Sequence, residues 1–319
     1  MIEVHEVGAE RAAEVLAVVR AGFGAREVLD PPSTATEETV ESVAAALGEH
    51  GGLLATSELG PVGAMLFEPA AEMLGLRRVA VDPDAQARGV AGAMVRHAER
   101  IAGERGFEGL RLRARAELPR TVRFWQHLGY TEVDADGPLL TMAKLLPVEL
   151  TLTSADETRE LGRRLAGVLR AGDLLILSGD LGAGKTTFTQ GVGAGLEVRG
   201  DVSSPTFVIS RVHPSLGPGP ALVHVDAYRL GGIEELDDLD LDTSLDDAVT
   251  VVEWGEGVAE GLADTRLEIH LTRARGGDRV VETGEPVDAD DTEDHDPRTL
   301  RVSPVGARWI GAGLRKALH

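Results

Sequence analysis

The residues with the most distinctive chemistry form one short stretch, Gly179-x4-Gly184-Lys185-Thr186. An apolar run at 174–177 precedes it and predicts a buried strand, and a helix is expected to begin near Lys185. Glycines let backbone N–H groups close around a polyphosphate, and a helix N-terminus adds positive charge. Lys185 can then reach the β- and γ-phosphates, while the Thr186 hydroxyl can bind Mg²⁺. The pattern predicts a nucleoside triphosphate site. A glycine-rich turn with a stray lysine is the alternative, disfavoured because the chain holds only three lysines.

Two carboxylates further along the chain each stand at the end of an apolar run. Asp226 lies in a predicted strand over 221–228, and Glu253 lies in another over 248–254. Because ligands of open α/β sheets bind at the carboxyl ends of the strands, we expect both acids beside the phosphate loop. Mg²⁺ prefers oxygen ligands, and Thr186 with one carboxylate and waters suffices. Two solvated acids at strand ends are the simpler alternative.

Composition limits the class of protein. A chain of 319 residues with 43% hydrophobic content can bury two cores, which favours two domains. The net charge of −21 argues against direct, sequence-independent binding to nucleic acid or to an anionic membrane. Cysteine is absent, which excludes thiol catalysis and thiolate metal sites. No apolar run is long enough to span a membrane and the N-terminus does not resemble a signal peptide, so we expect a cytoplasmic protein.

A second strand–turn–helix unit lies in the first half of the chain. A predicted strand over 76–81 leads to Gln86-x-x-Gly89-x-Ala91, which opens an amphipathic helix ending near Glu104. Such a turn can bind a pyrophosphate through backbone N–H groups, although the pattern alone is common. Further strands are expected over 2–6, 53–57, 62–67, 110–114, 130–134 and 139–145, and further helices over 11–21, 37–47 and 118–128.

This order of elements, the 86–91 turn and the segment FWQHLGY at 124–130 together resemble the GNAT family of N-acetyltransferases, over residues 1–146. The resemblance implies an α/β fold in which helices flank a mixed sheet. It also implies that backbone groups bind acetyl-CoA. A plain α/β domain with a glycine at a helix start remains the alternative. The implied acetyl-CoA residues are Val81, Gln86, Ala87, Arg88, Gly89, Val90 and Ala91.

One residue departs from the family pattern. Many members carry a tyrosine where this chain has Trp125, and that tyrosine protonates the departing thiolate. An indole N–H cannot act as a general acid. Acetyl-CoA binding is therefore a firmer expectation than efficient transfer. Substitute acid or base groups could be Glu68, Glu72, Glu117 or His127, and the sequence selects neither one of these nor an acetyl acceptor.

The second half begins after a short boundary at Pro147, with domains expected over 1–146 and 147–319. Ser154 is a plausible N-cap for a helix, and Glu157 completes a capping-box pattern. Residues 282–296 include eight acids and are read as an acidic, flexible insertion about 282–297 without chemistry. Strands are expected over 148–153, 207–212 and 299–302, helices over 155–170 and 304–317, and a hydroxyl-rich loop over 202–206.

Four motifs, GDLGAGKTT, V-x-SPTF, H-x-DAYRL and VEW, resemble in order and spacing the TsaE family of P-loop ATPases, from about 148 to 285. The resemblance implies a P-loop NTPase-like sheet, catalytic roles for Lys185, Asp226 and Glu253, and Mg²⁺ bound by Thr186 and Glu253. Residues 204–206 would act as a switch. The implied ATP-binding residues are Gly179, Asp180, Leu181, Gly182, Ala183, Gly184, Lys185, Thr186, Thr187, Thr206 and Trp254.

Members of this family work in bacterial tRNA threonylcarbamoyladenosine biosynthesis with TsaB and TsaD proteins, which modify adenosine 37. An acidic chain can serve tRNA in this way because its partners contact the RNA. The first hypothesis is thus an ATPase joined to an acetyltransferase domain. The second keeps the ATPase and makes the first domain a non-catalytic acyl-CoA-binding or docking module. A small-molecule kinase is disfavoured because no separate acceptor-binding domain is visible in the sequence.

Overall fold

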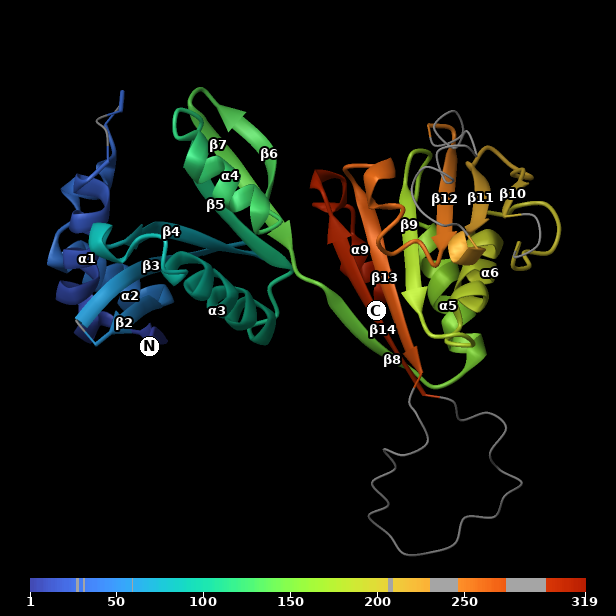
Figure 1. The fold of residues 1–319 in the computed structure, drawn as a ribbon, viewed down its shortest axis with the longest axis horizontal. Coiled ribbons are helices and arrows are strands. Elements are labelled where there is room, and N and C mark those ends of the chain that lie inside the picture. The colour runs from blue at the N-terminus through green and yellow to red at the C-terminus, as the bar shows by residue number, and fades with distance from the viewer. Residues whose placement is uncertain (27–28, 31, 59, 206–208, 230–245, 274–296) are drawn as a thin grey trace, which may run out of the picture. The chain divides into compact units, whose positions relative to one another are not determined.

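The chain divides into two compact units, Met1–Leu146 and Pro147–His319 (Figure 1). A computed structural model describes residues 1–319 except 27–28, 31, 59, 206–208, 230–245 and 274–296. The acidic segment at 282–296 and Thr206 therefore lie outside the described residues. Within the described ranges, no helix is both long enough and apolar enough to cross a membrane.

The first unit is built on a seven-stranded sheet in the order β1-β2-β3-β4-β5-β7-β6. All neighbouring pairs are antiparallel except β4 and β5, which run parallel. The mixed sheet with flanking helices predicted for this half is confirmed. Its elements are β1 Glu3–Val7, η1 Ala9–Arg11, α1 Ala12–Gly24, η2 Thr34–Glu37, α2 Val40–His50, β2 Gly52–Ser57, β3 Gly60–Ala70, β4 Met73–Val81, η3 Pro83–Ala85, α3 Val90–Glu104, β5 Gly109–Arg115, α4 Pro119–His127, β6 Thr131–Asp136 and β7 Leu139–Leu145.

Alternation along the central strands gives this sheet a separate core on each face. Leu54 and Leu66 pack with α1 and α2, whereas their neighbours Leu53 and Met65 pack with α3 and α4. Successive side chains of a strand point to opposite faces, so each strand supplies both cores. The α3 side is completed by the buried residues Met94, Val95, Ala98, Ile101, Trp125, Tyr130 and Met142.

The second unit has a seven-stranded sheet in the order β10-β11-β12-β9-β13-β14-β8. The four central strands β11, β12, β9 and β13 are parallel, and β10, β14 and β8 join by antiparallel pairing. This arrangement confirms the predicted P-loop NTPase-like sheet. Its elements are β8 Val148–Leu152, α5 Ala155–Ala166, β9 Leu174–Gly179, α6 Lys185–Gly195, β10 Ser210–His213, β11 Ala221–Asp226, η4 Ala227–Arg229, β12 Ala248–Glu253, η5 Glu260–Leu262, β13 Arg266–Arg273, β14 Arg298–Val305, η7 Ala307–Trp309 and α9 Leu314–Leu318.

The helix expected over 304–317 is wrong. β14 continues to Val305, which pairs with Arg266 of β13, and the chain then forms only a 3₁₀ turn and the short helix α9. Glycines 306, 311 and 313 all have positive φ angles, which a continuous helix does not accept. Trp309, only 1% exposed, anchors this irregular segment in the core.

Several other boundaries differ from the sequence reading by a few residues. The strand expected to reach Tyr228 ends at Asp226, because residues 227–229 turn into a 3₁₀ helix. The helix expected to end at 170 stops at Ala166. β13, a central parallel strand, has no counterpart among the predicted elements, although its burial alternates over Arg266–Arg273.

Candidate functional site

The glycine-rich loop of the second unit joins the carboxyl end of β9 to the first residue of α6. Gly179 and Gly184 adopt φ angles of +128° and +107°, a region that disfavours residues with a Cβ. A Cβ at Gly179 would collide with the Leu271 carbonyl, and one at Gly184 would lie 2.6 Å from Nη1 of Arg298. The two glycines therefore fix a tight loop that delivers Lys185 to the helix start.

Lys185 is buried, with 5% of the residue exposed. Its ammonium donates hydrogen bonds to the carbonyls of Gly179, at 2.8 Å, and Asp180, at 2.9 Å. The same Nζ lies 3.5 Å from the centre of the Trp254 ring. Burial lowers the pKa of Lys185 and outweighs the opposite effect of the nearby acids, Glu253 first among them. A buried cation held by loop carbonyls can exchange them for phosphate oxygens.

Asp226 and Glu253 lie opposite each other at the ends of the parallel strands β11 and β12, as the strand-end pattern predicts. Both are buried. Glu253 accepts a hydrogen bond from Thr186 Oγ1 to its Oε2, at 3.0 Å. Asp226 instead accepts from Ser204 Oγ and from the Tyr228 N–H, both at 3.0 Å. The two carboxylates thus have different partners: one faces the phosphate loop, and the other faces the hydroxyl-rich loop.

The donor set fits a magnesium ion. No cluster of three or more His, Asp or Glu side chains suitable for a metal occurs in the described ranges. Mg²⁺ does not need such a cluster, because it usually keeps several waters and binds through one or two carboxylates and substrate phosphates. The adjacent oxygens of Thr186 and Glu253 can supply the protein's share of such a shell.

Trp254 follows Glu253 in a left-handed conformation, with φ of +61°. Its N–H donates to the Leu177 carbonyl at 2.8 Å, and its ring lies 5.1 Å from that of Tyr228. The turn after β12 therefore places the Trp254 ring over Lys185, and Tyr228 from the turn after β11 packs against that ring. Of the other predicted nucleotide residues, Asp180, Leu181 and Gly182 are exposed, Ala183 is buried, Thr187 is half-buried and Thr206 lies outside the described residues.

Several residues near this loop received no role from the sequence. His224 Nε2 lies 2.8 Å from Glu253 Oε1, and Thr189 donates to the Lys185 carbonyl at 3.0 Å. The H-x-D spacing was a signal for His224, because residues two apart in a strand share a face. Arg298 reaches the loop from β14, and no local pattern marks it.

The predicted acetyl-CoA turn of the first unit lies between β4 and α3. Gly89 is the N-cap of α3 with φ of +79°, and Ala87 also has a positive φ, of +61°. Residues 86–89 are exposed, Val90 is buried, and Val81 and Ala91 are half-buried. The first turn of α3 contains no acid, so its N–H groups meet no competing carboxylate there. This is an accessible backbone surface suited to an anion.

The parallel strands β4 and β5 pair with each other only along their first residues. They pair over Met73–Leu76 and Gly109–Leu112, after which β5 continues with β7 and β4 with β3. The β3–β4 register shifts, placing Arg78 and Val79 opposite a single residue, and Arg78 has φ of +51°. A bulge of this kind leaves some backbone N–H and C=O groups without a partner strand and changes the direction in which they point.

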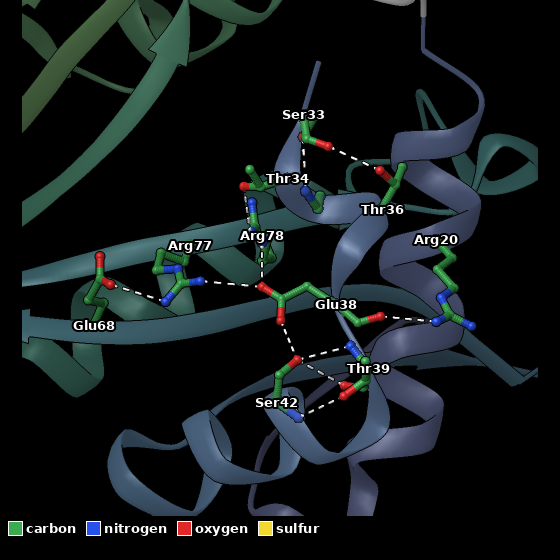
Figure 2. Close-up of polar contacts among 11 residues, drawn as sticks. Arg20, Ser33, Thr34, Thr36, Glu38, Thr39, Ser42, Glu68, Arg77 and Arg78 are labelled. Atoms are coloured by element: carbon green, nitrogen blue, oxygen red, sulfur yellow. Dashed lines mark hydrogen bonds and ion pairs between the residues drawn. The ribbon is translucent and has the colours of Figure 1, made fainter. Parts of the chain in front are cut away.

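A polar network holds this bulge, as Figure 2 shows. Glu38 accepts from Arg78 Nε at 2.9 Å, from Arg77 Nη2 at 3.3 Å and from Ser42 Oγ at 2.5 Å. Arg78 also donates to Thr34 Oγ1 at 3.1 Å. Burial of Glu38 raises its pKa, but the bonds from Ser42 and Arg78 and the two arginine charges prevail and hold the pKa below its usual value. Glu38 is therefore an anionic clamp rather than a base.

Trp125 points into the core of the first unit. It is 4% exposed, and its ring makes edge contacts, each at 5.1 Å, with Phe124 and Tyr130. The four alternative acid or base groups are not brought together. Glu68 binds Arg77, Glu117 binds Arg115, His127 Nδ1 lies 2.7 Å from the Arg123 carbonyl, and Glu72 lies in the turn between β3 and β4.

The parallel centre of the second sheet, with its glycine loop and buried lysine at a helix start, is the architecture of a P-loop domain. Residues 152–281 match the family described as threonylcarbamoyl adenosine biosynthesis protein TsaE. A TsaE protein of Streptomyces coelicolor is 59% identical over 157 residues, 49% of this chain and 96% of the relative. One from Mycobacterium bovis is 49% identical over 140 residues, 42% of this chain and 83% of the relative. The chain belongs to the TsaE family.

The first unit matches a second family. Residues 25–130 match the acetyltransferase (GNAT) family. The PaiA N-acetyltransferase from Thermoplasma acidophilum, solved in complex with coenzyme A, is 18% identical and covers 46% of this chain and 99% of its own, with a TM-score of 0.42. Both resemblances identified from the sequence are thus confirmed, and the chain joins a GNAT-like unit to a TsaE unit.

Proposed function

We propose that the second unit binds and hydrolyses ATP with Mg²⁺ and thereby supports tRNA threonylcarbamoyladenosine biosynthesis. The observation that carries this proposal is the hydrogen bond from Thr186 to Glu253 beside the buried Lys185. In this function Lys185 binds the terminal phosphates, and Thr186 and Glu253 hold the metal. The ion would supply charge neutralisation between the β- and γ-phosphates.

Asp226 has a separate part in this proposal. Its bonds to Ser204 and to the Tyr228 N–H connect the β11 end with the loop before the undescribed residues 206–208. A loop held in this way can change its position according to the phosphate bound. We assign Asp226 to support of hydrolysis or of the switch, and Glu253 to the metal.

The proposed partners are TsaD- and TsaB-like proteins, which would hold the tRNA. The net charge of −21 supports indirect contact with RNA, because phosphate backbones repel an acidic chain. Because the proposed function serves tRNA modification, we propose that the chain acts in the cytoplasm. ATP turnover measured alone and with these partners tests the proposal. Stimulated, magnesium-dependent phosphate release is expected, and turnover that ignores both magnesium and partners contradicts it.

For the first unit we propose acetyl-CoA binding through the backbone of Val81 and residues 86–91, with transfer of the acetyl group to an amine. The exposed turn at the start of α3 supports binding. The burial of Trp125 favours a second candidate, a non-catalytic acyl-CoA-binding or docking module. Calorimetry with acetyl-CoA tests binding, and thiol release against a panel of amines and peptides separates the two candidates.

A further inference from the structure

His224 is a fully buried histidine on β11, in register with β12 and two residues before Asp226. Its Nε2 lies 2.8 Å from Oε1 of Glu253. An ionised carboxylate only accepts hydrogen bonds, so the imidazole donates its Nε2 proton. Its other nitrogen, Nδ1, is buried without a hydrogen-bond partner among the described residues. Among the described residues, Glu253 is therefore the hydrogen-bond partner of the His224 imidazole.

The two oxygens of Glu253 have different donors. His224 contacts Oε1, and Thr186 donates to Oε2 at 3.0 Å. Thr189 also approaches Oε1, but at 3.5 Å, and its hydroxyl has a shorter bond to the Lys185 carbonyl. Among the described residues, the imidazole is thus the donor that lies closest to Oε1. Holding that oxygen fixes the rotation of the carboxylate and leaves Oε2 toward the phosphate loop.

We propose that His224 is a positioning residue for the magnesium site, which it serves by orienting the Glu253 carboxylate toward Thr186. The inference rests on the proposed ATPase function and adds a residue to it. A buried carboxylate without this donor is free to rotate and is less stable as an anion. Loss of an outer partner of a metal ligand typically lowers metal affinity about 10–100-fold.

The test measures how much Mg²⁺ strengthens binding of a non-hydrolysable ATP analogue, by calorimetry on the full chain with Mg²⁺ and with EDTA. We expect His224→Leu to reduce the magnesium-dependent gain about 10–100-fold and to leave the affinity in EDTA unchanged. His224→Gln, whose amide can replace Nε2–H, should recover most of the gain. His213→Leu is the matched control: His213 is a buried histidine of the neighbouring strand β10.

A full magnesium gain in His224→Leu overturns the role, as does an equal loss of affinity with and without the metal. The same loss in His213→Leu also overturns it, since any buried histidine would then serve. If His224→Leu does not fold, His224→Asn takes its place. The shorter asparagine amide occupies the position of Nδ1 and does not reach Glu253 as Nε2 does. A magnesium-dependent gain in affinity equal to that of His224→Gln would then contradict the proposal. A wild-type chain without any magnesium gain refutes the ATPase proposal itself, and this role with it.

Discussion

The chain contains two strand-to-helix turns that are similar in backbone construction, and we propose that each binds an anion. Each joins a strand to a helix through a glycine with positive φ, Gly184 before α6 and Gly89 before α3. Around the first, Lys185, Glu253 and Asp226 converge, all buried. Around the second, the residues at 86–89 are exposed, and the first turn of the following helix carries no acid in either case.

This difference separates binding from chemistry. Backbone N–H groups at a helix start suffice to hold a phosphate. Bond breaking also needs charged side chains placed where charge develops, and strands that end at one point are one way to bring them together. The second unit meets that condition through β9, β11 and β12. In the first unit, Trp125 stands where the family resemblance implies a tyrosine, and it is packed in the core.

The strongest test of this difference is to introduce a general acid into the first unit at Trp125. We expect wild-type protein to bind acetyl-CoA but to transfer slowly, and Trp125→Tyr to raise turnover by up to about 10²–10⁴-fold. Acetyl-CoA affinity should not change, because it depends on the backbone of the 86–91 turn. Steady-state thiol release and calorimetry measure the two quantities. Brisk wild-type transfer that the substitution leaves untouched would place the acid elsewhere.

In the second unit the side chains should matter more than the turn. Lys185→Ala is expected to remove tight ATP binding and to lower hydrolysis about 10²–10³-fold, because the terminal phosphates lose their fixed cation. Lys316→Ala, at an exposed lysine of α9, is the control and should behave as wild type. ATP affinity and phosphate release are the readouts. Normal binding by Lys185→Ala would refute the phosphate-loop assignment.

The two carboxylates can be distinguished by their partners. Glu253→Ala should retain nucleotide in EDTA, while the magnesium dependence of binding and hydrolysis falls by at least the roughly 10–100-fold typical of losing an outer partner of a metal ligand. Asp226→Ala should keep the magnesium-dependent gain in affinity and lose turnover, since Asp226 binds the Ser204 loop. Magnesium titrations of both variants decide the matter. If Asp226→Ala loses the metal and Glu253→Ala keeps it, the two roles are reversed.

The Glu38 clamp yields a smaller effect with a defined pH dependence. Glu38→Gln should lower the free energy of unfolding by about 1.5–3 kcal/mol at neutral pH, the usual range for a hydrogen bond to a charged group. The pKa of Glu38 is lowered in the folded chain, so its contribution is present above the unfolded pKa and disappears as the pH falls through the folded one. Urea unfolding should show the wild type and the variant converging in acid. A pH-independent difference would exclude the charge as its cause.

The smallest effect is expected from separating the units. A fragment starting at Pro147 should fold and bind ATP with the affinity of the full chain, because each unit has its own sheet and core. Circular dichroism and calorimetry on the fragment provide the check. An insoluble or nucleotide-free fragment would indicate that the second unit depends on the first.

Local patterns predicted the turns and the acids at the strand ends, but not the contacts between residues that are distant in the sequence. Two signals are visible in the sequence because each is contained in a few neighbouring residues. They are the spacing of Gly184 and Lys185, and the acid at the end of each apolar run. The bond between His224 and Glu253 depends on the register of β11 with β12, which no local pattern fixes. The same holds for Glu38 and Arg78, 40 residues apart. The helix expected over 304–317 failed because the pairing of β14 with β13 extends to Val305.

Trp254 illustrates a conflict between a site and the stability of its fold. A bulky residue held at positive φ costs of the order of 1–3 kcal/mol in backbone strain, which glycine at the same position avoids. Selection for thermal stability alone would thus favour glycine after Glu253. Glycine would also remove the ring that faces the Lys185 ammonium. Libraries screened only for heat resistance should therefore accept Trp254→Gly and lose the contact with Lys185 in exchange for stability.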